Sequence, residues 1–206
     1  MGIEIVRLKQ SQIDAVASIL GRAFHRDPLM EYVIRDADER SRLLPERFKR
    51  LLRLGCLFGE IWTTEDPIEG VAIWLPPDFK WSAEKIIASG LNEIPEIFGA
   101  GAVGRLREVV SREEFVRDRD IPEQHWYLLL VGVEPKRQGH GLGAQLLKPT
   151  LSRAEREGVP CYLETEEPRN VPFYLRCGFE QLVDGETVAH TGVRFWTFRR
   201  NPGRQQ

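Results

Sequence analysis

Along the chain, hydrophobic and polar residues either alternate, as in strands, or recur at helical spacing. Polar or glycine-rich stretches separate these segments. Alternation over residues 3–8 predicts a strand, and Ser11 then precedes apolar residues at helical spacing up to Phe24. The same criteria predict further strands near residues 57–64, 69–76, 126–133, 160–165, 179–184 and 190–199. They predict further helices near residues 39–54, 141–157 and 170–177, and a polar loop over residues 25–38.

Residues 80–120 are helical in pattern but irregular, because glycines at positions 90, 99, 101 and 104 interrupt the apolar spacing. Nothing there is long enough for a free linker, so we expect one domain over residues 1–206 with a helical insertion near 80–120. A hairpin lies early in the chain and a strand–helix–strand unit lies late. This mixture favours an α+β or mixed α/β fold class, with a central sheet covered by helices.

The composition of the chain limits which classes of partner we expect the protein to bind. The 29 basic and 31 acidic side chains give a net charge of −2, whereas binding to a nucleic-acid backbone normally requires a basic excess, so we expect no nucleic-acid partner. There is no apolar run of about 18 residues and no basic-then-apolar leader, so we expect no membrane span and a cytoplasmic protein. The three cysteines and four histidines lack the spacing of metal ligands, so we expect no metal.

The segment from Val131 to Ala144 carries the most chemistry. A predicted strand ends at Val133, a polar turn follows, and glycines at positions 139, 141 and 143 open an amphipathic helix. Helix starts have free N–H groups and the positive end of the dipole, and glycines let a phosphate approach the backbone closely. The segment therefore predicts a diphosphate cradle rather than a glycine-rich turn used only for packing.

Two other phosphate-binding motifs fit this segment poorly. Residues 139–144 formally match the dinucleotide fingerprint GxGxx(G/A), and Glu164 lies 20 residues after Ala144. However, residues 134–138 separate the strand from the first glycine, and the 62 residues after Ala144 are too few to complete a doubly wound domain. A Walker loop does not fit, because no Gly-Lys-Ser/Thr follows.

The sequence Gln138-x-x-Gly141-x-Gly143 resembles motif A of the GCN5-related N-acetyltransferases (GNAT), whose signature is (Q/R)-x-x-G-x-(G/A). Asn170, then Tyr174, then Gly178-Phe179 is similar to motif B of the same superfamily. The order of the predicted elements also matches, and within the superfamily the sequence most resembles the puromycin N-acetyltransferases. The resemblance implies the GNAT fold, a mostly antiparallel twisted sheet of about seven strands, splayed between the fourth and fifth and flanked by helices.

The resemblance further implies acetyl-CoA as the co-substrate and assigns residues to it. The backbones of Val131 and Val133 would bind the pantetheine arm, with Gly132 between them interpreted as a β-bulge. Asn170 would hydrogen-bond near the pantetheine or the acceptor. The pyrophosphate would be held by Gln138, Gly139, His140, Gly141, Leu142, Gly143 and Ala144.

Tyr174 is the candidate general acid, because its hydroxyl can protonate the leaving coenzyme A thiolate; outside the family comparison it fits a core tyrosine. The general base is open between His125, at the start of the strand before motif A, and Glu164, at the end of the strand after it. A solvent relay, or an amine that arrives neutral, needs neither residue.

The family fold places the acceptor across the sheet from the coenzyme. Asp27, Tyr32, Trp74 and Trp126 are the candidates for an acidic and aromatic pocket that holds a cationic amine, although the tryptophans fit a core role equally well. We expect the insertion near 80–120 to wall off this pocket, which favours a small-molecule amine over an extended peptide. The alternatives are a protein or peptide acceptor and a non-catalytic acyl-CoA sensor, and both a monomer and a homodimer are compatible with the sequence.

Overall fold

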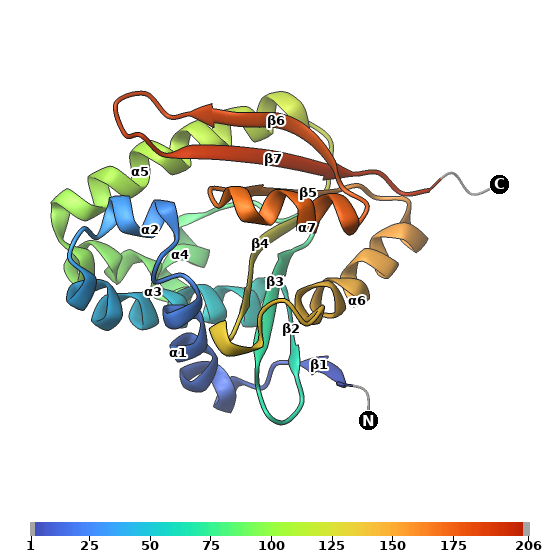
Figure 1. Cartoon of the computed structure of the whole chain (residues 1–206), viewed down its shortest axis with the longest axis horizontal. Helices are drawn as coiled ribbons and strands as arrows, with labels where there is room; N and C mark the ends of the chain where they lie inside the picture. Colours follow the sequence, from blue (N-terminus) through green and yellow to red (C-terminus); the bar gives the residue numbers. More distant parts are fainter. Residues whose placement is uncertain (1–2, 204–206) are drawn as a thin grey trace.

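Seven strands form one sheet in the order β1-β2-β3-β4-β5-β7-β6 in the computed structural model, which describes residues 3–203 (Figure 1). The strands are β1 Ile5–Arg7, β2 Glu60–Thr64, β3 Gly70–Leu75, β4 Trp126–Val133, β5 Cys161–Thr165, β6 Glu180–Thr187 and β7 Arg194–Arg200. Helices cover both faces of this sheet, so the fold class is mixed α/β, as the sequence predicts.

The sheet is split between β4 and β5. Every other neighbouring pair of strands is antiparallel, whereas β4 and β5 are parallel and pair only at Trp126–Cys161 and Tyr127–Tyr162. Beyond these two pairs β4 runs on to Val133, while β5 ends at Thr165. The carboxyl ends of the two strands therefore diverge, and this confirms the splayed sheet implied by the family resemblance.

The helices pack in two layers, one on each face of the sheet, and alternate side chains of the strands point into each layer. On β3, Val71 and Ile73 belong to a core with α1 (Ile13–Ala23) and α3 (Ala37–Phe58). Ala72 and Trp74 point to the opposite face, into a second core with α6 (Leu142–Glu157) and α7 (Val171–Arg176). Because successive side chains point to opposite faces, one fully buried strand supplies both layers.

A short helix, α2 (Pro28–Val33), lies in the segment predicted to be a loop. Two local residues start this helix. Asp27 caps it by accepting the Met30 N–H at 3.1 Å, and Pro28 occupies the first helical position. The prediction of a loop was wrong because a helix of six residues makes fewer than two turns and so shows no repeated apolar spacing. Helix α3 also continues to Phe58, so β2 starts at Glu60 rather than near residue 57.

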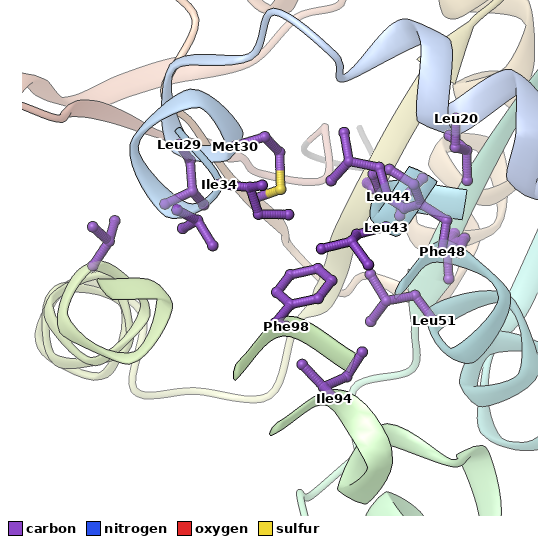
Figure 2. Packing of buried hydrophobic residues seen from close by; sticks show 14 of the residues in the cluster. Leu20, Leu29, Met30, Ile34, Leu43, Leu44, Phe48, Leu51, Ile94 and Phe98 are labelled. Atoms are coloured by element: carbon purple, nitrogen blue, oxygen red, sulfur yellow. The ribbon is translucent and has the colours of Figure 1, made fainter. Parts of the chain in front are cut away.

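The insertion consists of α4 (Ala83–Ser89) and α5 (Ile94–Asp120). Helix α5 bends at Gly99, whose φ of 77° and ψ of 156° are not helical, and then continues to Asp120. Figure 2 shows Ile94 and Phe98, before the bend, packed toward Leu43 and Leu51 of α3. The insertion is thus a packed part of the fold, and its regular section is longer than the glycines suggest.

The described residues also contain four short 3₁₀ helices: Gln10–Gln12, Leu91–Glu93, Pro135–Arg137 and Pro168–Asn170. None of the helices in the described range 3–203 is both long and apolar enough to cross a membrane.

Candidate active site

A cleft of about 600 Å³ opens where β4 and β5 part. Its walls come from the end of α1, the end of β4, the loop before α6, and the segment around α7. The lining residues are Ala23, Phe24, Arg26, Asp27, Val131, Gly132, Val133, Arg137, Gln138, Gly139, Gly141, Leu142, Gly143, Ala144, Glu167, Arg169, Asn170, Phe173, Tyr174, Arg176 and Cys177. The structure thus brings together the residues expected to bind the coenzyme, except His140.

The glycine-rich loop forms an open cradle at the start of α6. Gly139 and Gly141 have φ values of 80° and 78°, a left-handed conformation that favours glycine, and no atom lies within 4 Å of a Cβ built on either. Gly143 is confined instead, because a Cβ there would lie 3.1 Å from Cζ of Phe173. The first two glycines therefore shape the loop, and the third lets α7 approach it.

Two polar side chains of this loop have different roles. The side-chain amide of Gln138 donates to the Val133 carbonyl at 3.1 Å and so ties the loop to the end of β4. His140 is exposed, its Nδ1 lies 2.8 Å from the Gln138 carbonyl, and it does not line the cleft.

The bulge in β4 lies at Leu129 and not at Gly132. Ile73 pairs with Leu130 and Trp74 pairs with Leu128, so Leu129 is the extra residue on β4. Gly132 has a different function, since a Cβ there would lie 2.4 Å from Cδ2 of Leu20 on α1. The interpretation of Gly132 as a bulge was wrong: glycine there permits close packing of α1, and the bulge is set by pairing with β3.

Tyr174 is held firmly at the floor of the cleft. Its side chain is 4% exposed, and its ring packs against those of Phe173, Phe179 and Phe198 at centroid distances of 5.0, 6.1 and 5.4 Å. Burial, together with the charge of Glu166, raises the pKa of its hydroxyl well above the usual value. Tyr174 therefore remains a neutral O–H donor at the cleft.

The mouth of the cleft combines an amide with positive charge. The Asn170 Nδ2 donates to Thr165 Oγ1 at 3.2 Å, which fixes the orientation of this amide. Four arginines line the cleft, at positions 26, 137, 169 and 176, against only two acids, Asp27 and Glu167. Guanidinium groups around an open loop of N–H donors suit a ligand with several phosphates.

Asp27 lies in the wall of the same cleft as Tyr174. Burial and the negative charge of Glu166 raise the pKa of Asp27 to about 8, against the opposing effects of the Met30 N–H and Arg47. A carboxyl with this pKa changes protonation near neutral pH, which suits proton transfer.

The two residues first considered as bases lie elsewhere. His125 precedes the paired end of β4, eight residues before Val133, and it packs on Tyr162 with its pKa lowered by burial. At about 3.3 Å per residue, this is more than 20 Å along the strand from the loop end of the cleft. Glu164 is 5% exposed at its side chain, is bonded to Arg117 at 3.5 Å, and does not line the cleft.

The expected aromatic acceptor pocket is not formed by these tryptophans. Trp74 is fully buried, and Trp126 is 2% exposed and donates its Nε1 to Glu157 of α6 at 2.9 Å. Both lie in the core on the α6 side of the sheet, so neither can stack on a ligand. Tyr32 joins two helices instead, by donating from its hydroxyl to Glu108 of α5 at 2.9 Å. Of the four expected acceptor residues, only Asp27 lines the cleft.

A cluster of buried and half-buried charged residues near Asp27 was missed in the sequence. Glu166 lies just after β5, two residues beyond Glu164, and its charge acts on Asp27. Glu113 and Arg117 of α5, one turn apart, and Arg47 of α3 complete the group. The spacing of Glu164 and Glu166 was the available signal, but only the fold shows that α5 faces them.

The split sheet, the glycine-rich cradle and the acid–tyrosine pair define a mixed α/β protein whose cleft suits a phosphate-bearing ligand and a proton-transfer reaction. The chain belongs to the acetyltransferase (GNAT) family, whose model matches residues 53–179, more than half of its length. The chain is therefore an enzyme of the N-acetyltransferase class.

Individual proteins are similar to this chain in sequence or in fold. A protein of Schizosaccharomyces pombe described as the uncharacterized N-acetyltransferase C550.08 is 27% identical over 184 residues, which are 84% of this chain and 72% of that protein. The crystal structure of histone acetyltransferase HPA2 and related acetyltransferase from Corynebacterium glutamicum has a TM-score of 0.73 at 24% identity, over 98% of both chains. An agmatine N-acetyltransferase in its apo form has a TM-score of 0.62 at 14% identity, over 97% of this chain and 99% of its own.

The described residues contain no group of three or more histidine, cysteine, aspartate or glutamate side chains arranged to hold a metal ion.

Proposed function

We propose that this protein transfers an acetyl group from acetyl-CoA to the primary amine of a small molecule, by direct attack while both substrates are bound. The observation that carries the proposal is the cleft itself. Its lining combines the open glycine loop and four arginines with Asp27 and Tyr174.

The residues at the first end fit the coenzyme. The N–H groups at the start of α6 are free to bind the pyrophosphate, because Gly139 and Gly141 leave open space above the loop. Arg137 and Arg176 add positive charge for the phosphates, and the diverging end of β4 offers backbone groups to the pantetheine arm. When bound, acetyl-CoA supplies the thioester carbonyl that an amine can attack.

Asp27 and Tyr174 have complementary roles in proton transfer. The carboxylate of Asp27 accepts a proton from the acceptor ammonium, which leaves a neutral amine able to form the new C–N bond. The Tyr174 hydroxyl donates its proton to the thiolate sulfur as the C–S bond breaks. We therefore assign the base to Asp27 in place of His125 or Glu164, because Asp27 lines the cleft and they do not.

The contact between α5 and α2, the helix that Asp27 caps, supports a small molecule rather than an extended peptide. The Tyr32–Glu108 hydrogen bond joins the two helices, and Arg105 donates to the Val33 carbonyl at 2.6 and 3.0 Å. An extended peptide needs an open groove there. The solved structure of an agmatine N-acetyltransferase, a relative named for a small amine, has the same fold.

The test is release of the coenzyme A thiol from acetyl-CoA with a panel of small primary amines and a panel of peptides. The expected result is release with small amines and none with peptides, together with saturable binding of acetyl-CoA in calorimetry. Release with peptides alone would move the proposal to a protein acceptor. Tight acetyl-CoA binding without release for any acceptor would support the sensor alternative.

A further inference from the structure

A buried arginine holds the short helix that Asp27 caps. Arg40 is the fourth residue of α3 and is 6% exposed. A cation near the start of a helix is disfavoured, because this end of the helix dipole is already positive. Burial adds the free-energy cost of removing the charge from water. The guanidinium of Arg40 therefore depends on strong partners outside its own helix.

Most of these partners are main-chain carbonyls on both sides of α2. Nε of Arg40 donates to the His25 carbonyl at 2.9 Å. Nη1 donates to the carbonyls of Ile34 and Arg35, at 2.7 and 2.9 Å. Nη2 lies 3.6 Å from Oε1 of Glu31, within α2. All three nitrogens of one planar guanidinium thus bind α2 and the residues that flank it.

These hydrogen bonds fix the segment that carries Asp27. His25 precedes Asp27 by two residues, and Ile34 and Arg35 directly follow α2. A helix of six residues is not stable on its own, and the packing of its apolar side chains in the core is not directional. Hydrogen bonds at both ends therefore determine where α2 begins, and with it where the carboxyl of Asp27 lies.

Two further contacts hold one end of α2 each. Before the helix, Nε2 of His25 lies 3.0 Å from Oγ of Ser41 on α3. At its end, Arg105 of α5 donates to the Val33 carbonyl at 2.6 Å. Arg40 differs from both, because it binds the chain before and after α2 at once.

We propose that Arg40 is a positioning residue for the transfer reaction, which holds Asp27 in place at the cleft. Four of the five residues 23–27 line the cleft, and the carbonyl that Arg40 binds belongs to the fifth, His25. This inference rests on the proposed function, because Arg40 acts through the carboxyl assigned as the base.

The residues proposed to bind the coenzyme lie on other elements. The glycine loop precedes α6 and is tied to the end of β4 by the Gln138–Val133 hydrogen bond. Loss of the Arg40 guanidinium should therefore impair the reaction of the amine and leave coenzyme binding as it is.

The experiment compares two variants of Arg40 with a matched control. Arg40→Met keeps an unbranched side chain without charge or donors, and Arg40→Lys keeps the charge. The control is Arg50→Met, because Arg50 is on the same helix, is 9% exposed, and is bonded to Glu46 at 3.1 Å and to Glu93 at 2.5 Å. None of these three control residues lines the cleft.

Four quantities are measured with acetyl-CoA and straight-chain primary amines of three to six carbons. They are kcat and KM for the amine, the dependence of kcat/KM on pH, the Kd for coenzyme A in calorimetry, and the hydrogen exchange of amides. The amides are those of Met30, which donates to Asp27 Oδ1, and of Ile34, which donates to the Met30 carbonyl at 2.9 Å. Urea unfolding sets a temperature at which each variant is folded.

We expect kcat/KM for the amine to fall by about tenfold or more in Arg40→Met, the scale of a small displacement of a catalytic group. The Kd for coenzyme A should change by less than about twofold, and the two amides of α2 should exchange faster. The rising limb of the pH profile should move to lower pH, because a displaced Asp27 is more open to water and burial is what raises its pKa.

Arg40→Lys should show the same changes at smaller size, because one ammonium nitrogen does not replace the fork of a guanidinium. It serves as the test if Arg40→Met does not fold. Arg50→Met should lose stability but keep the kinetics, the pH profile and the exchange of the α2 amides.

Wild-type kinetics and pH profile in the folded Arg40 variants would overturn this inference and leave the proposed function standing. An equal loss of kcat/KM in Arg40→Met and Arg50→Met would also overturn it, because a general loss of stability would then account for the effect. Absence of coenzyme A release by the wild type with every amine would overturn both.

Discussion

At the scale of single residues, two side chains far apart in the sequence meet at one cleft. Asp27 caps a short helix that only the structure revealed, whereas Tyr174 belongs to a sequence motif. Their pKa values are both raised, but to different effect: the tyrosine keeps its proton, and the carboxyl exchanges its proton near neutral pH. Groups separated in this way can act as acid and base in one reaction.

Replacing the tyrosine tests the acid. Tyr174→Phe keeps the ring and its contacts with Phe173, Phe179 and Phe198 but removes the proton donor. We expect kcat to fall by about 10²-fold or more, with the Kd for acetyl-CoA unchanged. Steady-state kinetics and calorimetry measure the two quantities, and an unchanged kcat would exclude Tyr174 as the acid.

Replacing the aspartate tests the base. Asp27→Asn retains an oxygen that accepts the Met30 N–H, so α2 should remain capped. In the wild type, kcat/KM should rise with pH up to about 8, because only the ionised carboxyl accepts a proton. In the variant, kcat should fall by about 10²-fold or more, and the pH profile should follow the amine alone.

The control for helix capping is Asp36→Asn, since Asp36 caps α3 in the same manner by accepting the Glu39 N–H at 2.8 Å. It should leave the pH profile as it is. Retention of the wild-type profile in Asp27→Asn would assign the base to another group.

At the scale of elements, local patterns predicted the strands and the glycine loop well. The strand ending at Val133 and the helix starting at Leu142 lie where the sequence places them, because alternation and glycines act over few residues. The bulge at Leu129 could not be found in this way, because it depends on how β4 pairs with β3. The Arg117–Glu164 ion pair was missed for the same reason, since only the packing of α5 against β5 creates it.

Replacing each of two glycines, in different elements, by alanine should change the free energy of unfolding in opposite directions. In Gly132→Ala the new Cβ would lie 2.4 Å from Cδ2 of Leu20, so we expect a loss of about 1–3 kcal/mol in the free energy of unfolding. In Gly104→Ala, within α5, no atom lies within 4 Å of the new Cβ, and we expect a gain of about 0.4–1 kcal/mol. Urea unfolding measures both, and equal effects would contradict the packing described for β4.

At the scale of the whole molecule, the buried acids make stability depend on pH. The pKa values of Asp27, Glu113 and Glu164 are raised in the folded protein, whereas unfolded carboxyls titrate near pH 4. Between about pH 4 and about pH 8 these three groups therefore hold more protons in the folded chain than in the unfolded chain. The stability that these groups contribute is fully present below about pH 4 and is lost as the pH rises through their folded pKa values.

Glu113→Gln should reduce this dependence. The free energy of unfolding of the wild type should fall between about pH 5.5 and about pH 8, and the variant should show a fall smaller by about 1–3 kcal/mol. Urea unfolding at the two pH values checks this, with Asp118→Asn as the exposed control on the same helix. A pH dependence identical in Glu113→Gln and in the wild type would show that Glu113 is ionised in the folded protein.

Helix α5 touches both sides of the split sheet. It is tied to β6 through the Arg112–Glu186 ion pair and to β5 through Arg117, whose guanidinium also lies over the ring of Tyr127 of β4. The helix that carries Glu113 therefore contacts the two strands between which the sheet splits. A substitution that shifts α5 is expected to change the separation of these strands, and with it the width of the cleft between them.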